Sequence, residues 1–177
     1  MSFFLASASP RRKALLEQVG FRFDVLAVDI DETPYENENP ECYVKRMAQN
    51  KALEASQVAR QRPEADQKQH HVLLASDTSV VLGHTILGKP NNRLHFIAMM
   101  KQLSGRSHQV LTSVCVRLTA PFTDPKLENK AASKALAVET MAEKATTEKI
   151  IVVSTTVHFK TLSQDEIESY WNTTEPI

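Results

Sequence analysis

The first twenty residues change from an apolar extended segment to a helix, and this change constrains the fold more than any other feature of the chain. Phe3-Phe4-Leu5 predicts a short strand. Ser9 then favours a helix start, because its hydroxyl can accept a hydrogen bond from a backbone N–H group, and Pro10 suits the first helical position. Gly20 is typical of a helix end. The sequence therefore predicts a strand followed directly by a helix near 10–19.

Two arginines, Arg11 and Arg12, lie in the first turn of this helix. Cations at this end of a helix oppose its dipole, whereas an anion is stabilised there. With the hydroxyl of Ser9, the two side chains could form a cradle for phosphate, because guanidinium groups bind phosphate through paired hydrogen bonds. The alternative is a surface helix with two solvated arginines, and the spacing alone favours neither interpretation.

Strand-like and helix-like patterns alternate along the rest of the chain. Period-two alternation and short apolar runs indicate strands, whereas apolar residues three or four positions apart indicate helices. The expected strands lie near 2–6, 23–28, 72–75, 80–82, 85–87, 110–118 and 150–159, and the expected helices near 10–19, 40–59, 92–103 and 163–171. This order predicts an α/β fold with a mixed twisted sheet and flanking helices.

We expect residues 1–177 to form a single domain, because this is an ordinary length for one. The stretch 120–148 is rich in Ala, Lys, Glu and Thr and contains few large apolar side chains. Such a composition cannot bury much apolar surface, so we expect an exposed insertion that is part helical or disordered.

The composition excludes several classes of protein. Lys and Arg together number 21, as do Asp and Glu, and a net charge of zero argues against a general nucleic-acid binder. No segment has the length and apolarity of a membrane-spanning helix, and the first residues lack the pattern of a signal peptide. Cys42 and Cys115 lie far apart, without metal-binding spacing. We therefore expect a cytoplasmic protein with two reduced thiols and with neither nucleic acid nor membrane as a partner.

Asp77 is a candidate catalytic residue. Ser76-Asp77-Thr78 directly follows the apolar run Val72-Leu73-Leu74-Ala75, which predicts a buried strand. Side chains at the carboxyl ends of such strands commonly line the ligand site of an α/β sheet, where a carboxylate can act as a general base or hold Mg²⁺. The alternative is that Asp77 only caps a turn.

Lys51 lies on the apolar face of the helix expected near 40–59, which also carries Val44, Met47 and Ala48. A buried, unpaired ammonium group is costly, so the side chain must escape in one of two ways. It can extend to water along the helix surface, or it can meet carboxylates or phosphate in a polar cleft.

Two further places are weaker candidates. Gly88-Lys89-Pro90 follows the expected hairpin, and Lys89 offers a point charge suited to phosphate, although lysines in turns are usually solvated. The acidic residues Asp29, Asp31 and Glu32 could bind a cation or form a charged, exposed turn.

Several of these segments occur together in one family. Ser7-Ala8-Ser9-Pro10-Arg11-Arg12, Ser76-Asp77-Thr78 and Gly88-Lys89-Pro90 are followed by two longer segments, Leu103-Ser104-Gly105-Arg106-Ser107-His108-Gln109-Val110 and Val157-His158-Phe159-Lys160-Thr161-Leu162-Ser163. This ordered set resembles the Maf family of nucleoside triphosphate pyrophosphatases along essentially the whole chain apart from 120–148. The uninterrupted arginine pair looks like the branch that acts on dTTP and UTP.

The resemblance implies a Maf/ITPase-like sheet with a central cleft, in which a nucleoside triphosphate is hydrolysed to the monophosphate and diphosphate. Modified pyrimidine nucleotides are further candidate substrates. The resemblance implies a divalent cation, Mg²⁺ or Mn²⁺, near Asp77 and Glu32, with Asp77 as the proton acceptor and Glu32, Lys51 and Lys89 as further catalytic residues. The residues that match substrate-binding positions are Ser9, Arg11, Arg12 and Thr78.

One departure from the family concerns the end of the chain. The family continues after its Glu-Pro with further strands, whereas this sequence ends at Glu175-Pro176-Ile177. We therefore expect the last C-terminal strands to be missing and a sheet edge to be available for pairing in a homodimer. Two alternative functions follow: a catalytically impaired nucleotide-binding or regulatory remnant, and a structural or interaction protein.

Overall fold

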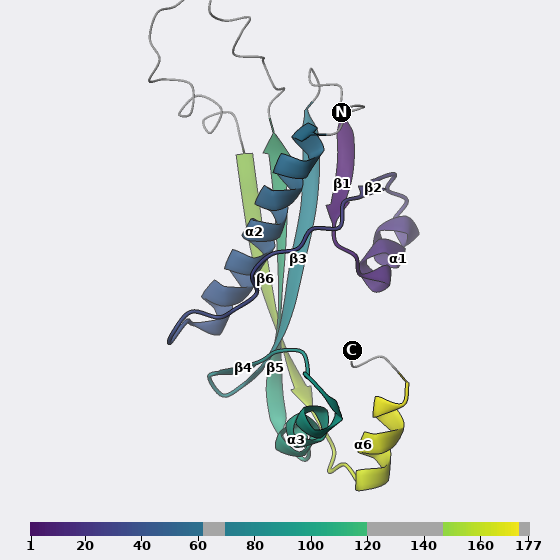
Figure 1. The fold of residues 1–177 in the computed structure, drawn as a ribbon, viewed down its shortest axis with the longest axis vertical. Coiled ribbons are helices and arrows are strands. Elements are labelled where there is room, and N and C mark those ends of the chain that lie inside the picture. Colours follow the sequence, from purple (N-terminus) through teal and green to yellow (C-terminus); the bar gives the residue numbers. More distant parts are fainter. Residues whose placement is uncertain (62–69, 120–146, 174–177) are drawn as a thin grey trace, which may run out of the picture. The chain divides into compact units, whose positions relative to one another are not determined.

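The computed structural model describes residues 1–61, 70–119 and 147–173, which form two compact units (Figure 1). The first unit comprises Met1–Thr33, Lys45–Asp77 and Ser113–Ile151, and the second comprises Pro34–Val44, Thr78–Thr112 and Val152–Ile177. The predicted loop at 62–69, most of the predicted insertion (120–146) and the last four residues lie outside the described residues.

The described residues contain a six-stranded sheet in which β2-β1-β3-β5-β6 are neighbours in that order and β4 pairs with β3. Pairing of β1 with β2 and β3 is parallel, whereas β3 and β4 form an antiparallel hairpin around Gly83 and His84. The strands are β1 Ser2–Ala6, β2 Asp24–Val25, β3 His71–Leu82, β4 Thr85–Leu87, β5 Ser107–Thr119 and β6 Thr147–His158. The prediction of an α/β fold with a mixed sheet is confirmed.

The helices of the described chain begin and end close to the predicted residues. They are α1 Pro10–Gln18, α2 Pro40–Gln61, α3 Arg93–Leu103 and α6 Gln164–Trp171. Gly20, with a φ of 81°, donates its N–H to the Glu17 carbonyl while Phe21 donates to Leu16, the bonding pattern of a Schellman helix end. None of these helices has the length and apolarity needed to span a membrane.

The core of the first unit lies between α2 and the sheet. Alanines three or four residues apart give α2 a smooth face, so that its backbone can approach the strands closely. This face comprises Ala48, Ala52, Ala55 and Ala59, and it packs with Phe4, Leu73, Ala75 and Cys115. The helix therefore lies against the same side of β3 from which Leu73 and Ala75 project.

The second unit has a core of its own. Val44, Val81 and Leu111 are buried together, with Val152 packed against them. In the same unit, the Phe96 ring of α3 lies 5.7 Å from the ring of Tyr170 and 5.1 Å from that of Trp171, both on α6 (distances between ring centroids). Each unit thus buries apolar side chains from segments that are distant in sequence.

Several predicted strand boundaries differ from the structure. The strand expected from 110 begins at Ser107. The runs 72–75 and 80–82 belong to a single strand, β3, which continues through Asp77. The extended segment expected at 23–28 forms a strand only at Asp24–Val25. The strand expected from 150 begins at Thr147, so the last two residues of the predicted insertion are part of β6. The ends of a strand depend on how it pairs with its neighbours, and the local composition does not determine that pairing.

The central cleft stays a prediction.

Candidate functional site

Asp77 lies in the interior of β3 and not at its end, so the prediction of its place in the strand is wrong. Asp77 is 8% exposed, and its side chain shares a face of β3 with Leu73 and Ala75, four and two positions earlier. The strand can carry a carboxylate at this point because the charge is compensated from α2. Asp77 Oδ1 accepts a hydrogen bond from Lys51 Nζ at 2.7 Å. The alternative of a turn cap is therefore also wrong.

Lys51 joins two carboxylates that are distant in sequence. Its Nζ lies 2.7 Å from Asp77 Oδ1 and 2.6 Å from Glu32 Oε1. The side chains are 13% exposed for Lys51, 11% for Asp77 and 50% for Glu32. Attraction at this range offsets the cost of removing the ammonium group from water. The prediction that the Lys51 ammonium group pairs with carboxylates is confirmed. The alternative, that the side chain extends to water along the helix surface, is wrong.

Arg12 connects the first turn of α1 to β3. Its Nη1 donates to the Ser76 carbonyl at 2.7 Å and to Ser7 Oγ at 3.4 Å. Burial lowers the pKa of the Arg12 guanidinium, and the charges of Asp77 and Glu32 partly oppose that shift. The guanidinium therefore lies within the electrostatic reach of the Lys51 cluster, which we define as Glu32, Lys51 and Asp77. The alternative of a freely solvated Arg12 is wrong.

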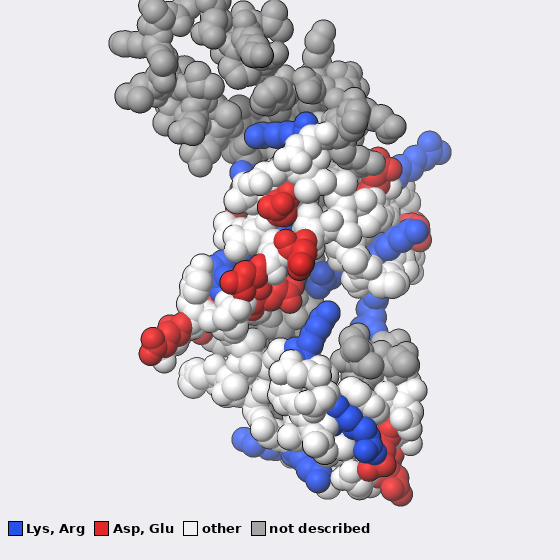
Figure 2. Space-filling view, viewed as in Figure 1, with Lys and Arg blue, Asp and Glu red and all other residues white. Residues whose placement is uncertain are grey.

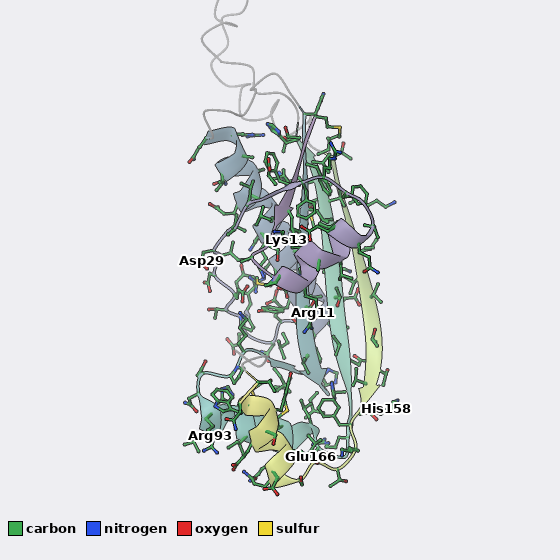
Figure 3. All side chains as sticks on the ribbon, turned by 90° about the vertical axis from the view of Figure 1, so that its right-hand side faces the viewer. Arg11, Lys13, Asp29, Arg93, His158 and Glu166 are labelled. Carbon is green, nitrogen blue, oxygen red and sulfur yellow. The ribbon has the colours of Figure 1, made fainter. Side chains whose placement is uncertain are left out.

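Arg11 and Ser9 lie at the start of the same helix. Arg11 is exposed in the first turn (Figure 3). Ser9 occupies the N-cap position with an extended backbone, as predicted, but its hydroxyl makes no capping bond. Instead, the Ser9 N–H donates to Ser7 Oγ at 3.2 Å. The prediction that the Ser9 hydroxyl caps the helix is therefore wrong, and the hydrogen bond to Ser7 shapes the chain before the helix instead.

Ser7 was not among the predicted site residues. It is buried directly after β1, and its hydroxyl accepts hydrogen bonds from Ser9 and Arg12. The signal that could have found it is the spacing Ser7-Ala8-Ser9, because a serine hydroxyl commonly accepts from the N–H two residues later.

The acidic residues at 29–32 do not act as a group. Asp31 Oδ1 accepts from the Thr33 N–H at 2.9 Å, and the hydrogen bonds with Thr33 lower the pKa of Asp31. Arg46 Nη2 donates to the Thr33 carbonyl at 3.1 Å, which ties this turn to α2. Asp29 is exposed (Figure 3), and Glu32 alone reaches Lys51. Within the described ranges, no three His, Cys, Asp or Glu side chains come together as a metal-binding group.

Thr78 and Lys89 belong to the second unit. Thr78 Oγ1 lies 3.4 Å from Thr112 Oγ1 on β5, and the Thr78 residue is exposed. Lys89 is exposed between β4 and α3. Their roles toward a substrate stay predictions.

The described surface carries charges of both signs. Figure 2 shows a group of Asp and Glu side chains on the middle of the face in view, with Lys and Arg mostly around it. Chemically, the Lys51 cluster combines a carboxylate that can accept a proton with a cation that can offset phosphate charge, and Arg12 adds a second cation beside it.

The chain is similar to known proteins along almost its whole length. The sequence model of a family described as Maf-like protein matches residues 2–177. Proteins named dTTP/UTP pyrophosphatase are 39% identical in Aliivibrio fischeri, 38% in Pasteurella multocida and 40% in Pseudoalteromonas translucida. These alignments cover 98%, 99% and 98% of this chain and 75%, 74% and 74% of the relatives.

A solved structure from Mycobacterium abscessus, described as a nucleoside-triphosphatase / dITP/XTP pyrophosphatase, aligns over 89% of this chain and 72% of its own. Its sequence identity of 11% and TM-score of 0.36 are too low to carry an argument. The family model and the relatives at 38–40% identity, in contrast, extend along almost the whole chain, and we conclude that the chain belongs to the Maf family.

Proposed function

We propose that this protein is a nucleoside triphosphate pyrophosphatase that hydrolyses dTTP and UTP. The observation that carries the proposal is the Lys51 cluster, in which the largely buried Lys51 bridges Asp77 and Glu32 beside the anchored Arg12. The names of relatives at 38–40% identity support the choice of reaction and of pyrimidine nucleotides.

In this reaction water breaks the anhydride bond between the α- and β-phosphates, and the products are the monophosphate and diphosphate. Asp77 would accept the proton that the attacking water loses, because its carboxylate lies at the centre of the site. Lys51, Arg11 and Arg12 would offset the negative charge of the phosphates. Lys89, Ser9 and Thr78 are proposed as further contacts with the nucleotide.

A divalent cation would bind at Asp77 and Glu32. Carboxylate oxygens are the ligands that Mg²⁺ and Mn²⁺ prefer. Two carboxylates suit a cation that also binds substrate phosphates, since Mg²⁺ is usually held by one or two carboxylates plus phosphate oxygens. When bound, the metal would stabilise charge on the phosphate oxygens. Lys51 would then keep the two carboxylates in place.

Asp77→Asn tests the proposal with little change in shape. We expect diphosphate release from dTTP and UTP to fall roughly 10²- to 10⁴-fold, because the substitution removes the proton acceptor and its charge. The control is Asp24→Asn, at an exposed position of β2, which should leave the rate unchanged. Near-parental turnover by Asp77→Asn would exclude the assigned role.

The same assay, run with a panel of nucleoside triphosphates, separates the proposal from its alternatives. A remnant would be stabilised by nucleotide without releasing diphosphate, since any ligand of the native state raises the melting temperature. A structural protein would show neither effect. The names of the relatives lend no support to a remnant.

We also propose that the protein acts in the cytoplasm. Both of its cysteines, Cys42 and Cys115, are free thiols in the structure, which suits a reducing compartment.

A further inference from the structure

Ser7 connects the strand, the helix and the arginine that meet at the proposed site. It directly follows β1, it is 8% exposed, and its Oγ receives two hydrogen bonds. One comes from the Ser9 N–H at 3.2 Å and the other from Arg12 Nη1 at 3.4 Å. A hydroxyl has two acceptor lone pairs, so these two donors use its accepting capacity in full.

The first bond fixes how the chain turns from β1 into α1. Because the Ser9 hydroxyl makes no capping bond, the turn before Pro10 depends on Ser7. A side chain that accepts from the N–H two residues later holds the backbone in a defined turn. The direction in which α1 leaves the strand is thereby set by a buried hydroxyl.

The second bond fixes the plane of the Arg12 guanidinium. Nη1 is held by Ser7 Oγ and by the Ser76 carbonyl, which accepts at 2.7 Å. Ser76 directly precedes Asp77 in β3. A guanidinium held by two acceptors cannot rotate freely, so its orientation relative to Asp77 is fixed before a substrate binds.

We propose that Ser7 is a positioning residue for nucleotide hydrolysis and acts through Arg12. The hydroxyl does not touch the phosphates. It orients the Arg12 guanidinium and the first turn of α1, and this preorganisation favours the transition state. The inference rests on the proposed function as far as catalysis is concerned, whereas the orientation of Arg12 can be tested without turnover.

Three substitutions at Ser7 separate this role from packing. Ser7→Ala removes the acceptor, and Ser7→Cys keeps the size of the side chain with only a weak acceptor. Both should lower kcat/KM for dTTP by about tenfold or more, the loss expected when a hydrogen bond to a charged group is removed. Ser7→Thr keeps the hydroxyl and should restore most of the activity.

Ser56→Ala is the matched control. Ser56 is likewise a buried serine of the first unit, and its hydroxyl donates to the Leu53 carbonyl at 2.6 Å. Its loss should change the melting temperature about as much as Ser7→Ala does but leave kcat/KM unchanged. If Ser7→Ala also changes only the melting temperature, Ser7 is a packing residue and the proposal is wrong.

A double substitution tests whether Ser7 acts through Arg12. In an Arg12→Ala background, Ser7→Ala should cause little further loss of kcat/KM, because the effects of substituting two residues of one interaction are not additive. If Ser7→Ala lowers kcat/KM equally in the parent and in Arg12→Ala, the proposal that Ser7 acts through Arg12 is wrong.

The mobility of the Arg12 guanidinium, measured from its Nε–H signal by NMR, gives a readout that needs no activity. Ser7→Ala should make this signal markedly more mobile and leave that of Arg93 unchanged, since Arg93 pairs with Glu168 in the second unit. An unchanged Arg12 signal would overturn the proposal. If the parent chain releases no diphosphate, the proposed function fails, while this measurement still decides the positioning of Arg12.

Discussion

At the scale of single residues, the position of Lys51 on the apolar face of α2 is explained by its two partners. An unpaired ammonium group at 13% exposure would destabilise the fold, but Asp77 and Glu32 accept its hydrogen bonds. The dependence is mutual, because the Asp77 side chain is slightly more buried than that of Lys51 and relies on the same ion pair. Removal of one partner therefore leaves a buried charge that the rest of the site must tolerate.

Lys51→Met should destabilise the protein as well as impair turnover. We expect a loss of about 1–3 kcal/mol in the free energy of unfolding, between the values for exposed and buried pairs, because the half-exposed Glu32 contributes less than Asp77. Diphosphate release should fall at the same time. Denaturant titration and the nucleotide assay measure both effects, with Lys101→Met, at an exposed position of α3, as the control. Unchanged stability would mean that the ion pair contributes no net energy.

At the scale of elements, local bonds fix the helix ends. In α6, Ser163 Oγ accepts from the Glu166 N–H at 3.3 Å while Glu166 Oε2 accepts from the Ser163 N–H at 2.9 Å, which completes a capping box. Lys160 Nζ also bonds to the Glu166 carboxylate. The hydrogen bond from Lys160 and that from the Ser163 backbone lower the pKa of Glu166 from 4.5 to about 2.

This shift predicts an acid-sensitive contribution to stability. The folded pKa of Glu166 is depressed, so the charged carboxylate stabilises α6 above pH 4.5, and that stabilisation is lost as the pH falls from 4.5 towards about 2. Glu166→Gln should therefore be less stable than the parent at pH 6 and approach it at pH 2. Amide hydrogen exchange in α6 across this range measures the difference. A stability difference between Glu166→Gln and the parent that does not change with pH would contradict the prediction. As a further check, Lys160→Met should remove most of the pH dependence of the stability of α6.

At the scale of the whole molecule, each unit has its own core, and the two cysteines lie in different surroundings. Cys115 is fully buried in the core of the first unit, whereas Cys42 is exposed near the start of α2. Burial, with the nearby Glu148, raises the pKa of the Cys115 thiol to about 12, and Arg117 only partly opposes this shift. Since the thiolate is the reactive form, Cys115 should be inert while the first unit is folded.

Iodoacetamide labelling at pH 8 followed by mass spectrometry should therefore modify Cys42 rapidly and Cys115 only when the first unit opens. Denaturant should bring the Cys115 rate up to that of Cys42. In Cys42→Ser, we expect no rapid labelling of the native protein. Rapid modification of Cys115 in the absence of denaturant would show that the core around α2 opens far more often than its packing implies.

The sequence by itself determined the kinds of elements and most of their ends. The residues that begin and end the helices act on backbone groups only a few positions away, so their effects can be predicted from the neighbouring sequence. They are Pro10, Gly20, Ser163 and Glu166. The hairpin around Gly83 follows from the same short-range chemistry. The ordered motifs also placed the chain in its family, which the comparisons confirm.

Only the tertiary structure decided which side chains meet. Lys51 and Asp77 are 26 positions apart, and the hydrogen bond from Arg12 to the Ser76 carbonyl spans 64. A helical or extended period gives the face on which a side chain lies, but the partner depends on how strands pair and how α2 packs on them. For that reason β3 runs through Asp77, and Ser7 rather than Ser9 organises the start of α1. Local sequence patterns could not predict that Asp77 lies inside β3, because the free energy that stabilises its charge there comes from long-range contacts.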